Sequence, residues 1–226
     1  MILKRPTDLT LAGQQGFTIV ELMIALSVLS TILVISSTVM ISLGSIYIKG
    51  INQSNTQNVA RNLLNELVGQ LQLGSAVPNI SGTIISPGIK AVCLGNQRYT
   101  YRLKYKLDGT DSKSHVLWRD SLKNSIICVP INITNAHPVD SYYDSSIPGT
   151  ELMPANMRLT EFHTTGNVDG TYTVSVTVAY GGDGTGLPTD LVQVSADGKT
   201  RCLSGQGSQY CAVSSLSQVV ANRGVN

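Results

Sequence analysis

The sequence predicts an α+β protein in which a long N-terminal helix packs on an antiparallel β-sheet. Between Phe17 and Ile48 the only charged residue is Glu21, so an apolar run of helical length comes first. After Lys49 the apolar residues recur at spacings of three to five, which is the spacing of one helix face. Beyond Thr83 the period falls to two, which is the period of strands. A helix followed by a series of strands is the α+β pattern.

Composition limits the classes of function that the chain can serve. Its 226 residues allow one globular domain and an anchoring segment. Charged residues make up 13% of the chain, against about 25% in soluble domains. This low charge, with abundant Ser, Thr, Asn and Gly, fits a surface that meets copies of itself or an extracellular medium. A net charge of +2 without basic clusters argues against nucleic acid as the main ligand.

The apolar run has the properties of a membrane anchor. As a helix, residues 17–48 would measure about 48 Å, whereas the hydrocarbon core of a bilayer is about 30 Å thick. The helix should therefore extend beyond the bilayer. Lys4 and Arg5 precede it and favour a cytoplasmic N-terminus, which places the C-terminal bulk outside. We predict a single-pass membrane protein.

One carboxylate lies inside this apolar run. A charged side chain in a membrane-spanning segment is costly, so Glu21 is a candidate functional residue. It ends the string Gly16-Phe17-Thr18-Ile19-Val20-Glu21, which follows a short polar segment with basic residues. This arrangement resembles the N-terminus of type IV prepilins and type II secretion pseudopilins. The resemblance covers roughly the first fifth of the chain.

The resemblance implies a processing pathway. A prepilin peptidase would cleave after Gly16 and N-methylate the new N-terminal Phe17, and Glu21 would act in assembly. The implied partners are this peptidase, other pilin or pseudopilin subunits and the pilus assembly platform in the membrane. The protein would reside in the cytoplasmic (inner) membrane and then in a periplasmic or extracellular filament. The expected segments are a leader, a transmembrane assembly helix, its amphipathic continuation and a disulfide-containing β-rich domain, at residues 1–16, 17–50, 51–75 and 76–226.

The roles of the three motif residues have a physical basis. Gly16 has no side chain to obstruct a peptidase. Cleavage would give Phe17 a free amine one helical turn from Glu21. When helices pack side by side, the amine of one subunit can neutralise the carboxylate of another and offset the cost of burying both charges.

The polar segment after Lys49 is predicted to continue the helix. Its apolar residues form one stripe, and Gly74 is a plausible stop signal. We expect this stripe to pack on the folded domain; it consists of Val59, Leu63, Leu64, Leu67, Val68 and Leu71. A separate helix after a break near Gly50 is the alternative.

Two hairpins are predicted beyond the helix. Residues 99–107 alternate as a half-buried strand, residues 108–111 form a turn, and residues 115–119 return, with Trp118 in the core. The second hairpin joins residues 157–163 to residues 171–180. Between the hairpins we expect a short strand at residues 126–129 and then a long surface loop at residues 130–155. The tail after the Gly-rich residues 181–186 is expected to be irregular.

Four cysteines follow the anchor, at Cys93, Cys128, Cys202 and Cys211. An even number on the exported side suggests two disulfides. Cys202 and Cys211 enclose a short Gly- and Ser-rich loop, which favours pairing 202 with 211 and 93 with 128. Zinc is the weaker alternative, because no Cys-x-x-Cys pair occurs and the three histidines lack ligand spacing.

No catalytic motif is present, so we do not expect an enzyme, and no cofactor or metal is expected. Calcium in the glycine-rich loop would need Asp183, Asp190 and Asp169, which have no recognisable ligand spacing. A plain glycine loop is favoured over a calcium site.

The leading hypothesis is a minor filament subunit, either a minor pilin or a J-like minor pseudopilin, because the chain is long and its C-terminal part is large. The alternative is a monomeric, membrane-anchored module that binds an extracellular ligand. DNA uptake is a third possibility, for which the weak charge gives little support.

Overall fold

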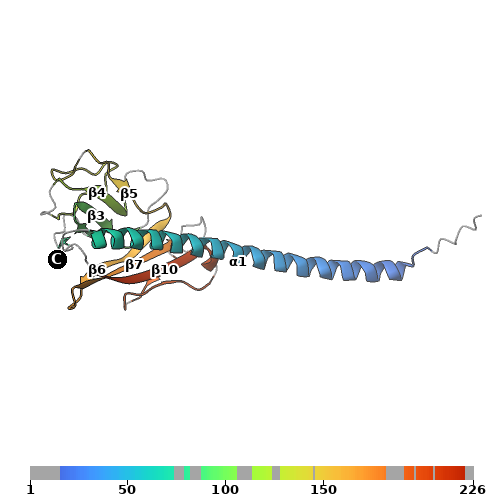
Figure 1. The fold of residues 1–226 in the computed structure, drawn as a ribbon. Coiled ribbons are helices and arrows are strands. Elements are labelled where there is room, and N and C mark those ends of the chain that lie inside the picture. Colours follow the sequence, from blue (N-terminus) through green and yellow to red (C-terminus); the bar gives the residue numbers. More distant parts are fainter. Residues whose placement is uncertain are drawn as a thin grey trace, which may run out of the picture. The chain divides into compact units, whose positions relative to one another are not determined.

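The computed structural model describes residues 16–73, 79–81, 88–105, 114–123, 128–144, 146–181, 191–195, 197–205 and 207–221. The chain forms two compact units, Met1–Ser45 and Ile46–Asn226. Helix α1 (Ile19–Leu73) contributes to both units (Figure 1). It has no interruption near Gly50. Together with the antiparallel sheets it confirms the predicted α+β class.

The described strands of the second unit are all antiparallel and form two main sheets and a small hairpin. Sheet A has the order β1-β2-β3-β4-β5, and sheet B has the order β10-β7-β6. The strands of sheet A are Asn79–Ser81, Ile89–Leu94, Gln97–Arg102, Leu117–Ser121 and Thr150–Glu151. Those of sheet B are β6 (Met157–Gly166), β7 (Thr171–Gly181) and β10 (Cys211–Ala221). The hairpin pairs β8 (Val192–Val194) with β9 (Thr200–Cys202), and one 3-10 turn (Ser208–Tyr210) precedes β10.

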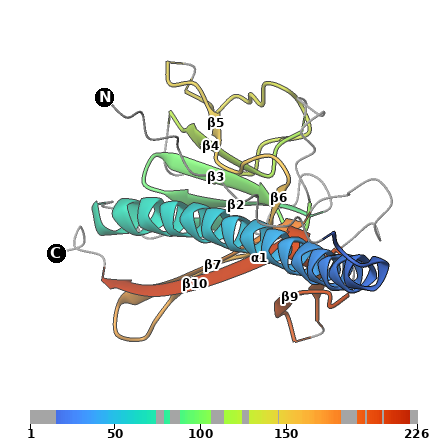
Figure 2. The same cartoon turned by 90° about the vertical axis from the view of Figure 1, so that its right-hand side faces the viewer.

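The C-terminal part of α1 and both main sheets share one hydrophobic core. In Figure 2 strands β2 to β5 of sheet A lie above this part of the helix, and β7 and β10 of sheet B lie below it. The predicted apolar stripe is confirmed: Val59 is partly buried and the other five residues are buried. They pack against residues such as Tyr99 of β3 and Phe162 of β6. Each buried leucine contributes about 1.5–3 kcal/mol.

Both predicted hairpins are confirmed, with a changed boundary in the first. In the first hairpin Tyr99 pairs with Arg119 and Tyr101 with Leu117, but β3 ends at Arg102. The strand does not continue through Lys104, because this residue has a positive φ of 65° and its N–H donates to the carbonyl of Leu159 (2.7 Å). The predicted turn at 108–111 lies outside the described residues.

The half-buried pattern predicted for residues 99–107 holds at Arg102, which is partly buried, and at Lys104, which is exposed, but not at Thr100. Arg98 and Thr100, on the face of β3 that points away from the helix, are both 0% exposed. The segment at residues 128–144 covers this second face. Ile131 and Ile133 are buried there beside Trp118, and the N–H of His115 donates to the carbonyl of Ile133 (2.8 Å).

The same segment corrects two further predictions. Residues 130–155 are not simply a surface loop, because part of this stretch packs as a layer on sheet A. Cys128 and Val129, the described residues of the strand predicted at 126–129, lie in no strand. The layer has little regular structure and no sequence period, so sequence periodicity could not reveal it.

A buried ionic cluster fastens this layer to sheet A. Arg98 donates from Nε to Oδ1 of Asp120 (2.9 Å), from Nη2 to Oδ2 of Asp120, and from Nη1 to Asp140 (2.6 Å) and the carbonyl of Val129 (2.9 Å). Burial by itself would lower the pKa of Arg98, but its hydrogen bonds to both aspartates prevail and raise it. Burial raises the pKa of Asp120, and Arg98 opposes this rise.

The prediction of an irregular C-terminal tail is also wrong. β10 pairs with β7 over eleven residues, from Cys211 opposite Gly181 to Ala221 opposite Thr171. The sequence of β10 is rich in small residues, and apolar and polar residues alternate poorly along it. The buried and exposed faces of this strand differ little in polarity, so no period of two stands out. Strand β2 was likewise not predicted as a separate element.

The structure joins Cys93 to Cys128 and Cys202 to Cys211, which are the favoured pairings, and both Cα–Cα distances are 5.8 Å. The first disulfide links β2 to the layer on sheet A. The second links β9 to the start of β10. Disulfides of this kind typically contribute about 2–4 kcal/mol.

Gly149→Ala is expected to destabilise the fold. A Cβ at this position would lie 2.4 Å from Cζ2 of Trp118, whose ring is buried. Overpacking of this kind costs about 1–3 kcal/mol. Gly69→Ala is the matched control, because a Cβ in this helical position meets nothing within 4 Å and should stabilise by about 0.5–1 kcal/mol. Urea denaturation of the two variants in detergent would test the opposite signs; equal stability would contradict the packing argument.

Candidate processing and assembly site

The predicted motif lies at the beginning of α1, and Thr18 caps the helix. The hydroxyl of Thr18 accepts a hydrogen bond from the N–H of Glu21 (3.2 Å), and its carbonyl accepts from the N–H of Leu22 (3.1 Å). A Thr followed three residues later by Glu is the sequence of a capping box. The motif therefore defines where the helix starts, in addition to carrying the charge.

The residues at the expected cleavage point are accessible. Gly16 and Phe17 precede the first helical residue, and Phe17 is 80% exposed. A Cβ on Gly16 would meet no atom within 4 Å. The described part of the fold therefore places no steric restriction on the residue at position 16.

Glu21 lies in the first turn of α1 with its side chain exposed. A carboxylate in this position interacts favourably with the positive end of the helix dipole, by about 0.3–1 kcal/mol at an exposed site. Of the sequence-predicted site residues, Gly16, Phe17 and Glu21 lie together in this segment. The four cysteines lie in the second unit as two disulfides.

The helix that follows the motif has an apolar exposed surface. Large side chains from Phe17 to Ile51 are exposed, and within the described residues α1 is the helix that is long and apolar enough to cross a membrane. Its hydroxyl groups bond to backbone carbonyls of the preceding turn at 2.8–3.1 Å, in Ser27, Ser30, Thr31, Ser37, Thr38, Ser42 and Ser45. These bonds remove much of the cost of placing hydroxyls in lipid.

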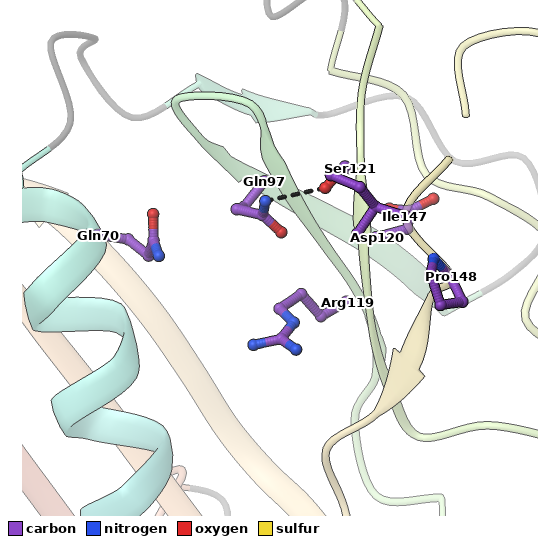
Figure 3. Close-up of a pocket in the computed structure, with 7 residues that line it drawn as sticks. All are labelled: Gln70, Gln97, Arg119, Asp120, Ser121, Ile147 and Pro148. Carbon is purple, nitrogen blue, oxygen red and sulfur yellow. Dashed lines mark hydrogen bonds between the residues drawn. The ribbon is translucent and has the colours of Figure 1, made fainter. Parts of the chain in front are cut away.

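A second candidate site is a polar hollow in the second unit, between α1 and sheet A (Figure 3). Its volume is 240 Å³, and it is lined by Gln70, Gln97, Arg119, Asp120, Ser121, Ile147 and Pro148. The amide of Gln97 donates to the hydroxyl of Ser121 (2.9 Å), as Figure 3 shows. No sequence pattern indicates this hollow, since its lining residues come from separate segments.

The charged groups around this hollow are engaged with one another. Arg119 donates to Oε1 of Glu66 on α1 (2.8 Å), which also accepts from the hydroxyl of Tyr99 (3.1 Å). Burial and the neighbouring Glu66 raise the pKa of Tyr99. Asp120 is held by Arg98. The hollow thus contains hydrogen-bonding groups for a polar ligand but no arrangement of nucleophile and base.

The described residues contain no group of three or more His, Cys, Asp or Glu side chains that could hold a metal ion. Asp169 accepts hydrogen bonds from the hydroxyl (2.6 Å) and N–H (3.0 Å) of Thr171, which lower its pKa. Asp183 and Asp190, the other two candidates for calcium, lie outside the described residues.

Comparison with known proteins identifies one segment. Residues 11–37 match the family model described as the prokaryotic N-terminal methylation motif. The matched segment includes the expected cleavage point, the helix cap and Glu21. It supports the resemblance to type IV pilins and pseudopilins and, with the apolar helix, supports membrane anchoring. No curated protein and no solved structure matches the chain.

Proposed function

We propose that the protein is a structural subunit of a type IV pilus or a type II secretion pseudopilus. A prepilin peptidase cleaves it between Gly16 and Phe17 and methylates the new N-terminus. The C-terminal domain lies on the outer side of the cytoplasmic membrane, and the processed chain is incorporated into a helical filament. The observation that carries this proposal is the motif match at residues 11–37, at the start of an apolar exposed helix.

The geometry of the motif supports the assembly role of Glu21. Thr18 holds the helix start in place, so the carboxylate stands one turn from the amine that cleavage would create. In a packed bundle of helices the amine of one subunit would neutralise this carboxylate on its neighbour. The exposed apolar side chains between Phe17 and Ile51 supply the surface for such packing.

A minor rather than a major subunit is favoured by the size of the second unit. It contains two main sheets, a disulfide-linked hairpin and an additional layer over sheet A. The presence of Glu21 argues against the tip pseudopilin, which commonly lacks it. A large individual domain suits a subunit present in few copies.

Mass spectrometry of the membrane-embedded and filament-bound protein tests the processing step. We expect the mature chain to begin at Phe17 and to be heavier by one methyl group on its amine. Treatment with a reductant before analysis should leave this terminal mass unchanged. An intact Met1 on the membrane-embedded protein would refute processing and favour the membrane-anchored binding module.

A further inference from the structure

The two edges of sheet B differ in how they are protected. β6 carries Arg158, Glu161 and His163 and has a register shift between Leu159 and Glu161. Charges and bulges are the usual devices that prevent an edge strand from pairing with another chain. β10, at the opposite edge, has no charged residue and no proline, and it pairs with β7 without a register shift.

The hydrogen bonds of β7 determine which residues of β10 direct their backbone N–H and C=O groups away from β7. The hydroxyl of Thr160 on β6 donates to the carbonyl of Thr177, so Thr177 directs its backbone groups toward β6. Val176 and Val178 therefore face β10, where they pair with Leu216 and Ser214. The even-numbered residues of β10 thus bond to β7, and the odd-numbered residues face outward.

A contact with α1 agrees with this assignment. The side-chain amide of Gln53 donates to the carbonyl of Val213 (3.2 Å), so this odd-numbered residue does face outward. Within the described part of the chain, no comparable partner reaches the backbone of Ser215, Ser217 or Val219. Their side chains are exposed, and Val219 is 61% exposed.

From this unprotected edge we propose that β10 is a docking strand, to which a neighbouring filament subunit adds an uncharged extended strand. Three residues offer three N–H and three C=O groups, enough to pair with a segment of about five residues. An uncharged partner is favoured because β10 presents hydroxyls and Val219 rather than charges that could form ion pairs. This proposal rests on the proposed function, which supplies the neighbouring subunits.

Ser217→Pro in the full-length chain tests the docking strand. The N–H of Ser217 faces outward, so its loss removes no bond to β7, but proline prevents an added strand from pairing there. Ser217→Lys leaves the N–H in place and puts a charge on the edge. We expect each variant to lower the amount of protein in sheared filaments by about tenfold, with thermal unfolding close to that of the unaltered chain.

Two matched controls separate pairing from surface changes. Ser217→Ala removes the hydroxyl, which lies 3.0 Å from that of Ser175, but keeps the outward N–H. Thr165→Lys introduces the same charge on an exposed residue of β6. Both should be incorporated like the unaltered chain. Hydrogen exchange of a peptide covering residues 213–221 should also slow when the protein enters the filament.

The outcomes are distinguishable. Suppose that Ser217→Lys enters filaments normally while Glu21→Gln is excluded from them. This result would refute the docking strand and leave the proposed function in place. An equal loss of incorporation for Thr165→Lys would also refute the docking strand, because the added charge alone would then explain the loss. Absence of the unaltered chain from filaments would refute both proposals.

Discussion

Glu21→Gln is expected to leave the protein in the membrane and to lower its incorporation into filaments by roughly a hundredfold. The substitution preserves shape but removes the charge that would neutralise the amine of Phe17 on a neighbouring subunit. A charge left unpaired in a medium of low dielectric costs about 3–5 kcal/mol, which corresponds to more than a hundredfold in an equilibrium constant. The measurement is the fraction of the protein in sheared filaments relative to the membrane fraction.

Thr18→Ala is the control for the helix cap. It removes the hydroxyl that accepts from the N–H of Glu21 and should cost only about 1 kcal/mol. If Glu21 acted mainly through the cap and the helix dipole, the two variants would lower incorporation to a similar extent. Unchanged incorporation of Glu21→Gln would rule out the pairing mechanism.

Arg98→Met is expected to destabilise the second unit by about 3–5 kcal/mol at neutral pH. The variant leaves Asp120, which is 2% exposed, without its cation in the interior. Trp118 is the only tryptophan of the chain and packs from sheet A against the layer that Arg98 fastens, so its fluorescence reports unfolding directly. Denaturation of the full chain in detergent would give the difference in unfolding free energy.

The effect of Arg98→Met should depend on pH. Burial already raises the pKa of Asp120, and removal of Arg98 takes away the group that opposes this rise. A carboxyl group whose pKa is higher in the folded than in the unfolded state is destabilising once it ionises. The variant should therefore be closest to the unaltered protein below the ordinary aspartate pKa and should lose stability as pH rises toward 7.

Arg119→Met is the matched control on the neighbouring strand. Arg119 forms an ion pair with Glu66, but its side chain is 37% exposed, and exposed pairs contribute about 0–1 kcal/mol. A double variant with Arg98→Met and Asp120→Leu should recover much of the lost stability, because no unpaired buried charge remains at position 120. Equal effects of Arg98→Met and Arg119→Met would contradict the buried cluster.

The sequence predicts those elements of this fold whose residues repeat with a clear period. The stripe from Val59 to Leu71 and the hairpin of β6 and β7 were predicted because one face is apolar and the other polar. The sequence does not predict β10, because the buried Val220 and its exposed neighbour Val219 are equally apolar. The layer over sheet A was not predicted either, since Ile131 and Ile133 are buried by contacts with distant strands.

The residues of the candidate processing site can be proposed from the sequence alone, because Gly16, Phe17 and Glu21 lie within one short segment. The cap formed by Thr18 adds a geometric role, and the spacing of Thr18 and Glu21 is the sequence signal for it. The hollow beside Arg119 depends on residues from α1, sheet A and the segment before β5. Such a set is assembled only by the tertiary fold, so no local pattern could have indicated it.

The hydroxyl groups of α1 have a consequence for how neighbouring helices could slide along one another. Because Ser27, Ser37 and Ser42 already donate to their own backbone, few hydrogen bonds remain that could hold a neighbouring helix at one position along the helix axis. In a filament built from such helices, stretching would meet its main resistance at the N-terminal end of α1. There the ion pair between Glu21 and the amine of Phe17 on a neighbouring subunit would favour one axial position of the helices over the others.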